Sequence, residues 1–375
     1  GYALLGIFPT KTVVLISLSL IAIGGSFVKP VISGTVKKTS PPDLSKLGFS
    51  IFYMVVNIGG FTGKIVAKLL RQDLGGWISH SRHEAIKGWV AANVPPFEID
   101  AALAARAAEQ SPPMSPESFL EMLKWQGFGM QAICLFSAAM ALVALVLAAV
   151  LYREPDRTGE PAISIGKTFA DMVRLFGDLK FVSFILIFAG FDLMFWQLYL
   201  TIPKYIVTHI SETAPMEWIV SINPLMIILL QLPVARLVMR VRPLHTMALG
   251  MGISAAAMVL MGVFPTLWGA GLSIMLFAIG EMTFAPRFLE YISSLAPRGK
   301  VGLYLGFSYL RSFIAYIVGG WLGGKLLVRY VPETGEREPL GMFLVFAAIG
   351  AAALVALFAY DRVVGEQSGE ERAAA

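Results

Sequence analysis

The sequence predicts an all-α membrane protein, a bundle of helices that each cross a lipid bilayer. Hydrophobic residues make up 56% of the chain and charged residues 15%, whereas soluble domains carry about 25% charged residues. Three tracts, 129–152, 246–280 and 339–360, contain no charged residue, and a helical span needs only about 20 residues. None of them alternates as a barrel strand does. The tracts therefore predict spanning helices.

We expect nine complete spans, with residues 2–8 as the end of one further helix. The tract 246–280 is long enough for two spans, and Phe264, Pro265 and Thr266 form the turn between them. The nine expected spans are approximately 12–36, 48–70, 129–152, 181–206, 217–239, 244–264, 267–290, 301–327 and 340–361.

The positions of Lys and Arg predict the orientation of the spans. If the loop 37–47 is cytoplasmic, most of the basic residues in short loops fall on the cytoplasmic side, as the positive-inside rule requires. The net charge of +5 therefore follows the membrane topology, and lipid rather than nucleic acid is the expected partner. We expect a multi-pass protein of a bacterial inner membrane. The oligomeric state stays open.

The spans form two unequal groups on either side of a polar linker. Residues 1–152 would be the remainder of an N-terminal six-helix half, with an insertion on the outer face at 71–127. Residues 153–180 would be a cytoplasmic linker, and 181–362 a C-terminal six-helix half. Repeat-built membrane bundles often pair two six-helix halves. We therefore expect a chain that is incomplete at its N-terminus, with a natural nine-helix protein as the alternative.

The segments outside the spans contain further expected helices. The pattern of 163–176 predicts an amphipathic helix on the inner membrane surface. In the insertion, 97–110 is rich in alanine, and a helix should begin at Ser115 with Pro116 in its first position. Residues 363–375 would be a polar cytoplasmic tail.

Two charged residues lie deep in the expected spans. Lys29 precedes Pro30 and lies about 12 Å along the helix from Lys37, at 1.5 Å per residue. Glu281 lies near the middle of its span. A charged side chain there costs at least ~2.5–3.5 kcal/mol, so it usually has a partner or a function. We hypothesise that Lys29 and Glu281 attract each other.

Structural interpretations stay open beside this one. Lys29 could extend to the cytoplasmic interface, and Glu281 could form a purely structural ion pair with Arg311 or Arg287. Asp192 lies within a span, and its proton-coupling and structural interpretations weigh about equally.

Other chemistries lack the residues that they require. Cys134 is the only cysteine, so neither a disulfide nor a cysteine-rich metal site is expected. The spans contain no zinc-protease motif, Gly-flanked nucleophilic serine or aspartate pair, and no P-loop occurs. We therefore expect neither an enzyme nor a bound cofactor.

Four segments of the chain resemble, in order, the motifs of one transporter family. They are GGSFVKPVIS at 24–33, FYMVVNIGG at 52–60, SINPL at 221–225, and GE at 280–281 with the later AP and LAP pieces up to 297. They are similar to the fourth, fifth, eighth and tenth helices of the proton-dependent oligopeptide transporter (POT/PTR) family. That family belongs to the major facilitator superfamily, whose fold is a helical bundle of two pseudo-symmetric halves.

The resemblance implies proton-coupled symport of di- or tripeptides, or peptide-like solutes, by alternating access. Lys29 and Glu281 would face each other across a central cavity and bind a peptide's carboxylate and ammonium, and substrate or a proton would break their contact. With Asp192 they would serve proton coupling or gating, and a proton gradient would supply the energy. Tyr53, Asn57 and Asn223 would complete the substrate site. The two amides could instead hydrogen-bond between helices, and Tyr53 could simply pack.

Three positions depart from the family pattern and change the C-terminal side of the expected pocket. Ala285 stands where a serine is common, and Ser308 and Phe188 stand at two tryptophan positions. The alternatives are therefore a major facilitator transporter of another small amphoteric solute, or a non-transporting membrane receptor or scaffold. Neither the exact substrate nor the proton stoichiometry follows from the sequence.

Overall fold

The protein is helical in its computed structural model, and no strand occurs among the residues that the structure describes. These are residues 1–8, 11–41, 44–70, 104, 108, 115–152, 165–211, 214, 216–297, 299–332 and 335–374. Within them, nine helices are long and apolar enough to cross a membrane. The expectation of nine spans is therefore confirmed.

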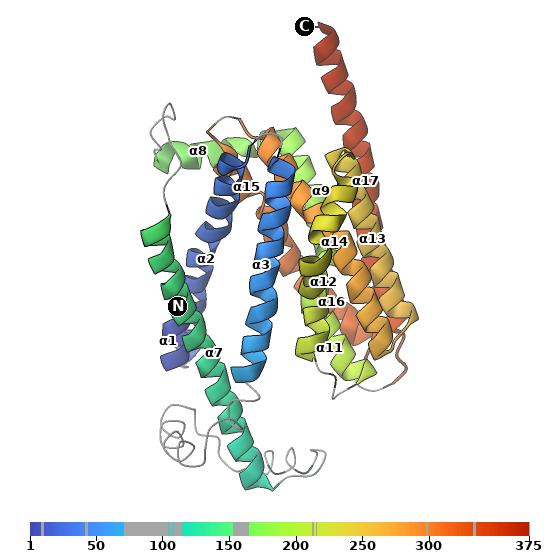
Figure 1. Ribbon diagram of the computed structural model, residues 1–375. Helices are drawn as coiled ribbons and strands as arrows, with labels where there is room; N and C mark the ends of the chain where they lie inside the picture. Colours follow the sequence, from blue (N-terminus) through green and yellow to red (C-terminus); the bar gives the residue numbers. More distant parts are fainter. Residues whose placement is uncertain are drawn as a thin grey trace. The chain divides into compact units, whose positions relative to one another are not determined.

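The helices keep the order that the sequence predicts (Figure 1). The short helix α1 (Tyr2–Ile7) comes first. The spanning helices include α2 (Lys11–Thr39), α3 (Ser45–Lys68), α7 (Pro116–Leu151), α9 (Leu179–Phe195), α12 (Met216–Val238), α13 (Pro243–Val263), α14 (Leu267–Leu295) and α17 (Pro339–Ala374). The turn between α13 and α14 lies where it was predicted. There the Thr266 side chain caps α14 by accepting a hydrogen bond from Gly269 N at 3.0 Å.

Helix α7 differs from the prediction in its length. The sequence predicts one helix beginning beside Ser115 and a separate span at 129–152, whereas α7 runs without a break from Pro116 to Leu151. Proline begins it because the first helical position needs no N–H donor. The expected alanine-rich helix at 97–110 falls largely outside the described residues.

Two predicted spans are interrupted. The first divides into α9, α10 (Gln197–Leu200), α11 (Ile202–Tyr205) and η2 (Ile206–Ile210). The second divides into α15 (Val301–Phe307) and α16 (Leu310–Tyr330). At the first break, Gln197 Nε2 donates to Leu193 O at 2.7 Å. At the second, Ser308 Oγ donates to Leu305 O at 2.7 Å. These side chains bond to carbonyls that a regular helix pairs with backbone N–H groups.

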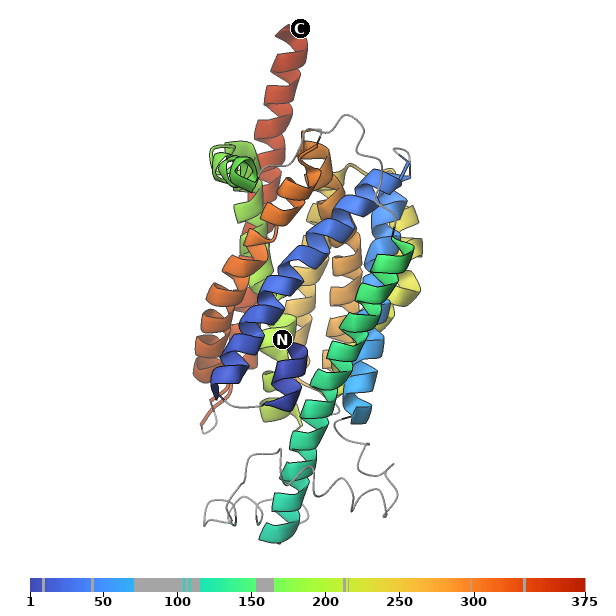
Figure 2. The ribbon, with the colours of Figure 1, turned by 90° about the vertical axis from the view of Figure 1, so that its left-hand side faces the viewer.

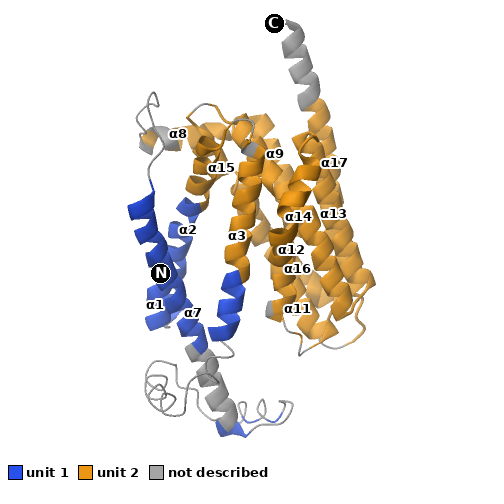
Figure 3. Cartoon of the chain, in the orientation of Figure 1, with its two compact units in different colours: residues 1–28, 62–154 blue, residues 29–61, 155–375 orange. Residues whose placement is uncertain are grey.

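The described chain forms two compact units, residues 1–28 with 62–154 and residues 29–61 with 155–375 (Figure 3). In the first unit, α1 packs on α7. In the second, α13 packs on α14 and α17, and α9 packs on α16 and α17. The predicted division into two halves with a linker is a separate question and stays a prediction.

Helix α8 (Ile165–Leu175) lies in the predicted linker and is seen end-on in Figure 2. Its Asp171 forms an ion pair with Lys300 at 2.9 Å. Phe176, which follows α8, meets the ring of Phe307 edge-on at 4.9 Å. These contacts join the linker helix to α15, within the second unit.

Phenylalanines of α9 and α14 form the centre of the second unit's core. The rings of Phe188 and Phe288 lie 4.7 Å apart, and those of Phe191 and Phe284 lie 4.8 Å apart. Phe188 is fully buried. This departure from the family pattern therefore serves core packing.

Helix α14 approaches α13 closely just before Glu281. A Cβ atom on Gly280 would lie 2.3 Å from Ser254 Oγ and 2.7 Å from Gly250 O. Only glycine allows this contact, as at other close helix crossings in membranes. The contact fixes the backbone from which Glu281 projects.

Candidate functional site

Glu281 lies at a meeting point of three helices. Its side chain is on α14 and is 5% exposed. The Tyr53 hydroxyl, on α3, donates to Glu281 Oε1. Asn223 Nδ2, on α12, donates to Glu281 Oε2 at 2.8 Å. Both carboxyl oxygens accept a hydrogen bond, which is the arrangement that an ionised carboxylate requires.

A second tyrosine extends this arrangement. The Tyr199 hydroxyl, on α10, donates to Asn223 Oδ1 at 3.1 Å. Asn223 is 1% exposed, and its amide thus accepts from Tyr199 and donates to Glu281. Tyr199 was not predicted, because it lies in no recognisable motif. It reaches Asn223 from α10, the short helix that follows the interruption after α9.

Prolines disturb the helices beside these polar residues. Pro224 follows Asn223 within α12, and Pro286 lies within α14. Proline has no N–H group, so Pro286 leaves Met282 O without its usual helical donor. Gln231 Nε2 of α12 donates to this carbonyl at 3.2 Å. An interhelical hydrogen bond therefore stabilises α14 next to Glu281.

Lys29 lies elsewhere in the second unit. Its ammonium is 5.9 Å from the centroid of the Tyr309 ring, within the range of a cation–π contact. Arg311 is its charged neighbour. No ion pair joins Lys29 to Glu281 among the described residues. The hypothesised attraction between the two is therefore not a direct contact in this structure.

Asp192 forms a buried ion pair with Arg311, joining α9 to α16. Asp192 is 1% exposed and also accepts from Ser312 Oγ at 2.9 Å. The Arg311 guanidinium lies 4.2 Å from the centroid of the Phe288 ring. The partner found for Arg311 is thus Asp192, and its pairing with Glu281 stays an untested interpretation.

The other arginine considered for Glu281 is also held elsewhere. Arg287 pairs with Glu290 at 2.8 Å and donates to Val238 O at 2.7 Å. Asn57 Nδ2 donates to Tyr53 O of its own helix at 2.9 Å. Of the predicted site residues, the structure brings together Tyr53, Asn223 and Glu281.

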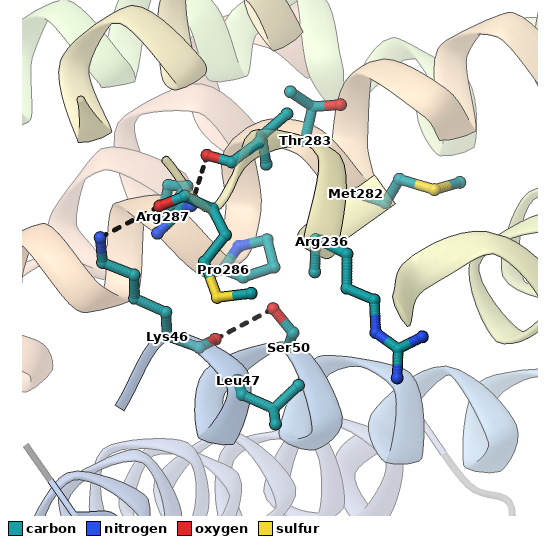
Figure 4. A pocket seen from close by; sticks show the side chains of 11 residues that line it. Lys46, Leu47, Ser50, Arg236, Met282, Thr283, Pro286 and Arg287 are labelled. Carbon is teal, nitrogen blue, oxygen red and sulfur yellow. Dashed lines mark hydrogen bonds between the residues drawn. The ribbon is translucent and has the colours of Figure 1, made fainter. Parts of the chain in front are cut away.

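Two basic side chains cap the end of α12, beside a pocket between α3, α12 and α14 (Figure 4). Lys46 Nζ donates to Met239 O at 3.3 Å, while Arg287 donates to Val238 O. Cations at a helix C-terminus complement its dipole. The pocket reaches Met282, the residue after Glu281. In the described ranges, no three His, Cys, Asp or Glu side chains gather as a metal site.

Comparisons with known proteins show likenesses in part of the sequence and in the fold. Residues 207–374 match the model of the Major Facilitator Superfamily. The multidrug resistance protein MdtH of Salmonella paratyphi B is 30% identical over 188 residues, which cover 48% of this chain and 46% of that protein. The same protein of Salmonella newport gives the same figures. The chain thus spans about half the length of the curated relatives that it matches.

Solved structures share the fold. The fucose:proton symporter FucP of E. coli superposes with a TM-score of 0.58 at 16% identity, covering 96% of this chain and 81% of FucP. A peptide transporter POT in complex with alafosfalin gives 0.53 at 20% identity, with 97% and 77% covered. With the spans counted above, these likenesses show an integral multi-pass membrane protein with the all-α major facilitator fold.

Proposed function

We propose that this protein is a secondary active transporter of the major facilitator superfamily that moves a small solute by alternating access. The observation that carries the proposal is the buried carboxylate of Glu281, which accepts hydrogen bonds from Tyr53 and Asn223 on two other helices. A carboxylate inside a membrane costs free energy to bury, so its presence there usually indicates a function. A chain with this fold and such a group is suited to transport rather than to catalysis.

The finer proposal is proton-coupled symport of di- or tripeptides or peptide-like solutes. A peptide carries a carboxylate and an ammonium at a fixed separation. Lys29 offers a cation, with Tyr309 as the neighbour found for it, and Glu281 offers an anion. A proton on Glu281 would remove its charge, so the proton and the substrate ammonium would compete for the same group. The motif resemblance and the structural likeness to a peptide transporter POT support this cargo.

The four other predicted site residues also have proposed roles. Asn223 and Tyr53 would hold Glu281 in the substrate site, as their hydrogen bonds to it suggest. Asn57 would line the site from the turn after Tyr53. Asp192 would serve gating through its ion pair with Arg311, because that pair joins the two interrupted helices.

The test is a substrate screen on the full-length protein in liposomes with an inward pH gradient. Radiolabelled dialanine, trialanine, fucose and an amphoteric amino acid would be compared, with and without a protonophore that collapses the gradient. Gradient-dependent uptake of dialanine or trialanine supports the finer proposal. Uptake of another solute alone keeps transport and rejects peptides. No uptake of any solute would favour a receptor or scaffold.

The identity with MdtH supports a second cargo class. Because a named multidrug resistance protein is 30% identical over 188 residues, apolar organic cations belong in the same screen. Gradient-driven export of ethidium, with dialanine neither transported nor competing, would favour that alternative.

A further inference from the structure

Three side chains form a chain of hydrogen bonds that ends on Glu281 and has one direction. The Tyr199 hydroxyl donates to Asn223 Oδ1 at 3.1 Å, and Asn223 Nδ2 donates to Glu281 Oε2 at 2.8 Å. An amide accepts only through its oxygen and donates only through its nitrogen. The donation from Tyr199 therefore turns the Asn223 N–H groups towards Glu281, where they stabilise an ionised carboxylate.

A proton on Glu281 conflicts with this direction. The proton comes from water, and we place its new O–H bond on Oε2, the oxygen that accepts from Asn223, which turns Oε2 into a donor. A donor there needs an acceptor, because an unpaired buried polar group is costly. Asn223 can supply its Oδ1 only if the amide rotates by half a turn. Its Nδ2 then faces Tyr199, whose hydroxyl must change from donor to acceptor.

We propose that Tyr199 is a positioning residue that senses the protonation of Glu281 through the orientation of the Asn223 amide. This inference rests on the proposed function, whose proton coupling it deepens. Tyr199 belongs to α10, the short helix between α9 and α11, where the helix is interrupted twice. Its ring also lies 5.8 Å from that of Trp196, the residue at the first interruption. Tyr199, Asn223 and Glu281 thus form a relay, which links a proton at Glu281 to the interruption of the helix at Trp196.

The charged and titratable groups near these three side chains come from three helices. They are Tyr53 on α3, Asp192 on α9, and Arg311 and Tyr316 on α16. Arg311 is held by Asp192, and Tyr53 donates to the other carboxyl oxygen. Neither of these two contacts involves the Tyr199 hydroxyl.

The direct test is the infrared difference spectrum of the purified full-length protein between high and low pH, without any solute. The relay predicts a carboxyl C=O band that Glu281→Gln removes, together with a tyrosine C–O band that Tyr199→Phe removes. Tyr316→Phe is the matched control, because the Tyr316 ring also stacks on Trp196, at 4.5 Å, yet lies outside the relay. This control should leave both bands unchanged.

Two results would overturn the inference: a Glu281 band without any contribution from Tyr199, or no Glu281 band at all over the range in which the protein stays folded. If Tyr199→Phe does not fold, ring-deuterated tyrosine in the wild-type protein shows whether a tyrosine band changes. Asn223→Ala, which cuts the relay at its middle, must then abolish that change.

Dialanine uptake separates this inference from the proposed function. In liposomes, Tyr199→Phe should lower the ratio of gradient-driven uptake to gradient-free exchange about 3- to 10-fold, the worth of one hydrogen bond. An unchanged ratio contradicts the relay. If the two infrared bands appear in a protein that transports no solute, peptide transport fails while the relay stands.

Discussion

The ion pair between Asp192 and Arg311 offers a measurable test of how the second unit holds together. We expect Arg311→Gln to destabilise the protein strongly. Asp192 is 1% exposed, and without Arg311 it keeps the hydrogen bond from Ser312 at 2.9 Å but loses its opposite charge. Removal of one partner of a buried pair costs about 3–5 kcal/mol.

The reverse substitution and the double substitution separate charge from packing. Asp192→Asn leaves the guanidinium over the Phe288 ring, 4.2 Å from its centroid, so its cost should fall about 1–2 kcal/mol below that of Arg311→Gln, the worth of a cation–π contact. The double variant removes both charges. It should recover most of the loss, because neutral replacement of a whole buried pair is often tolerated.

Equilibrium unfolding in mixed detergent micelles, followed by circular dichroism, measures these free energies. Arg329→Gln is the matched control, since Arg329 is an exposed arginine of the same helix, and it should change the free energy of unfolding by less than about 1 kcal/mol. If Arg311→Gln stays within about 1 kcal/mol of the wild type, or if the double variant is the least stable of the three, this reasoning about the buried pair is refuted.

Three further substitutions test separate contacts. Gly323→Ala should cost about 1–3 kcal/mol, because the new Cβ would lie 2.3 Å from Thr201 Oγ1. Gly324→Ala is the control, since a Cβ there has nothing within 4 Å, and it should be neutral or stabilising in the same unfolding assay. Equal effects of the two substitutions would contradict the contact. Gln231→Leu should cost about 1–3 kcal/mol by leaving Met282 O without a donor, and a neutral result would mean that this carbonyl needs none. Burial, with a smaller contribution from a nearby arginine, lowers the pKa of His209 below its ordinary value of 6.5. The folded state then binds fewer protons than the unfolded chain. The stability that the neutral His209 ring contributes is therefore complete above about pH 6.5 and is lost as the pH falls below it. The His209 ring stacks on that of Tyr205, with the centroids 5.4 Å apart. His209→Phe should keep this stacking and show a smaller fall in melting temperature between pH 7.5 and 5.5, and an identical fall would contradict the assignment.

The sequence predicted the membrane spans well because hydrophobicity and length alone determine them. The turn at Phe264–Thr266 and the Pro116 start of α7 also followed from local chemistry. The interruptions at Trp196 and Ser308 did not, because hydropathy stays high across both. They depend instead on which carbonyls the nearby polar side chains reach, and this requires coordinates.

The candidate site was predicted only in part. Glu281 and Asn223 stood out as a charge in mid-span and as part of a motif, and the structure brings them together. Tyr199 was missed, since a tyrosine near a span end has many ordinary roles. The sequence offered Glu281 two arginine partners, Arg311 and Arg287, and did not pair Arg311 with Asp192. That ion pair depends on how α9 and α16 pack.

In the function that we propose, the carboxylate of Glu281 and the ammonium of Lys29 serve proton-driven transport. The measurement that tests it most directly is gradient-driven uptake, in liposomes, of the solute identified by the screen, with Glu281→Gln and Lys29→Ala proteins incorporated in equal amounts. The account predicts that both variants lose most of the gradient-driven uptake, while Glu281→Gln retains exchange without a gradient. Undiminished gradient-driven uptake in both variants would contradict it.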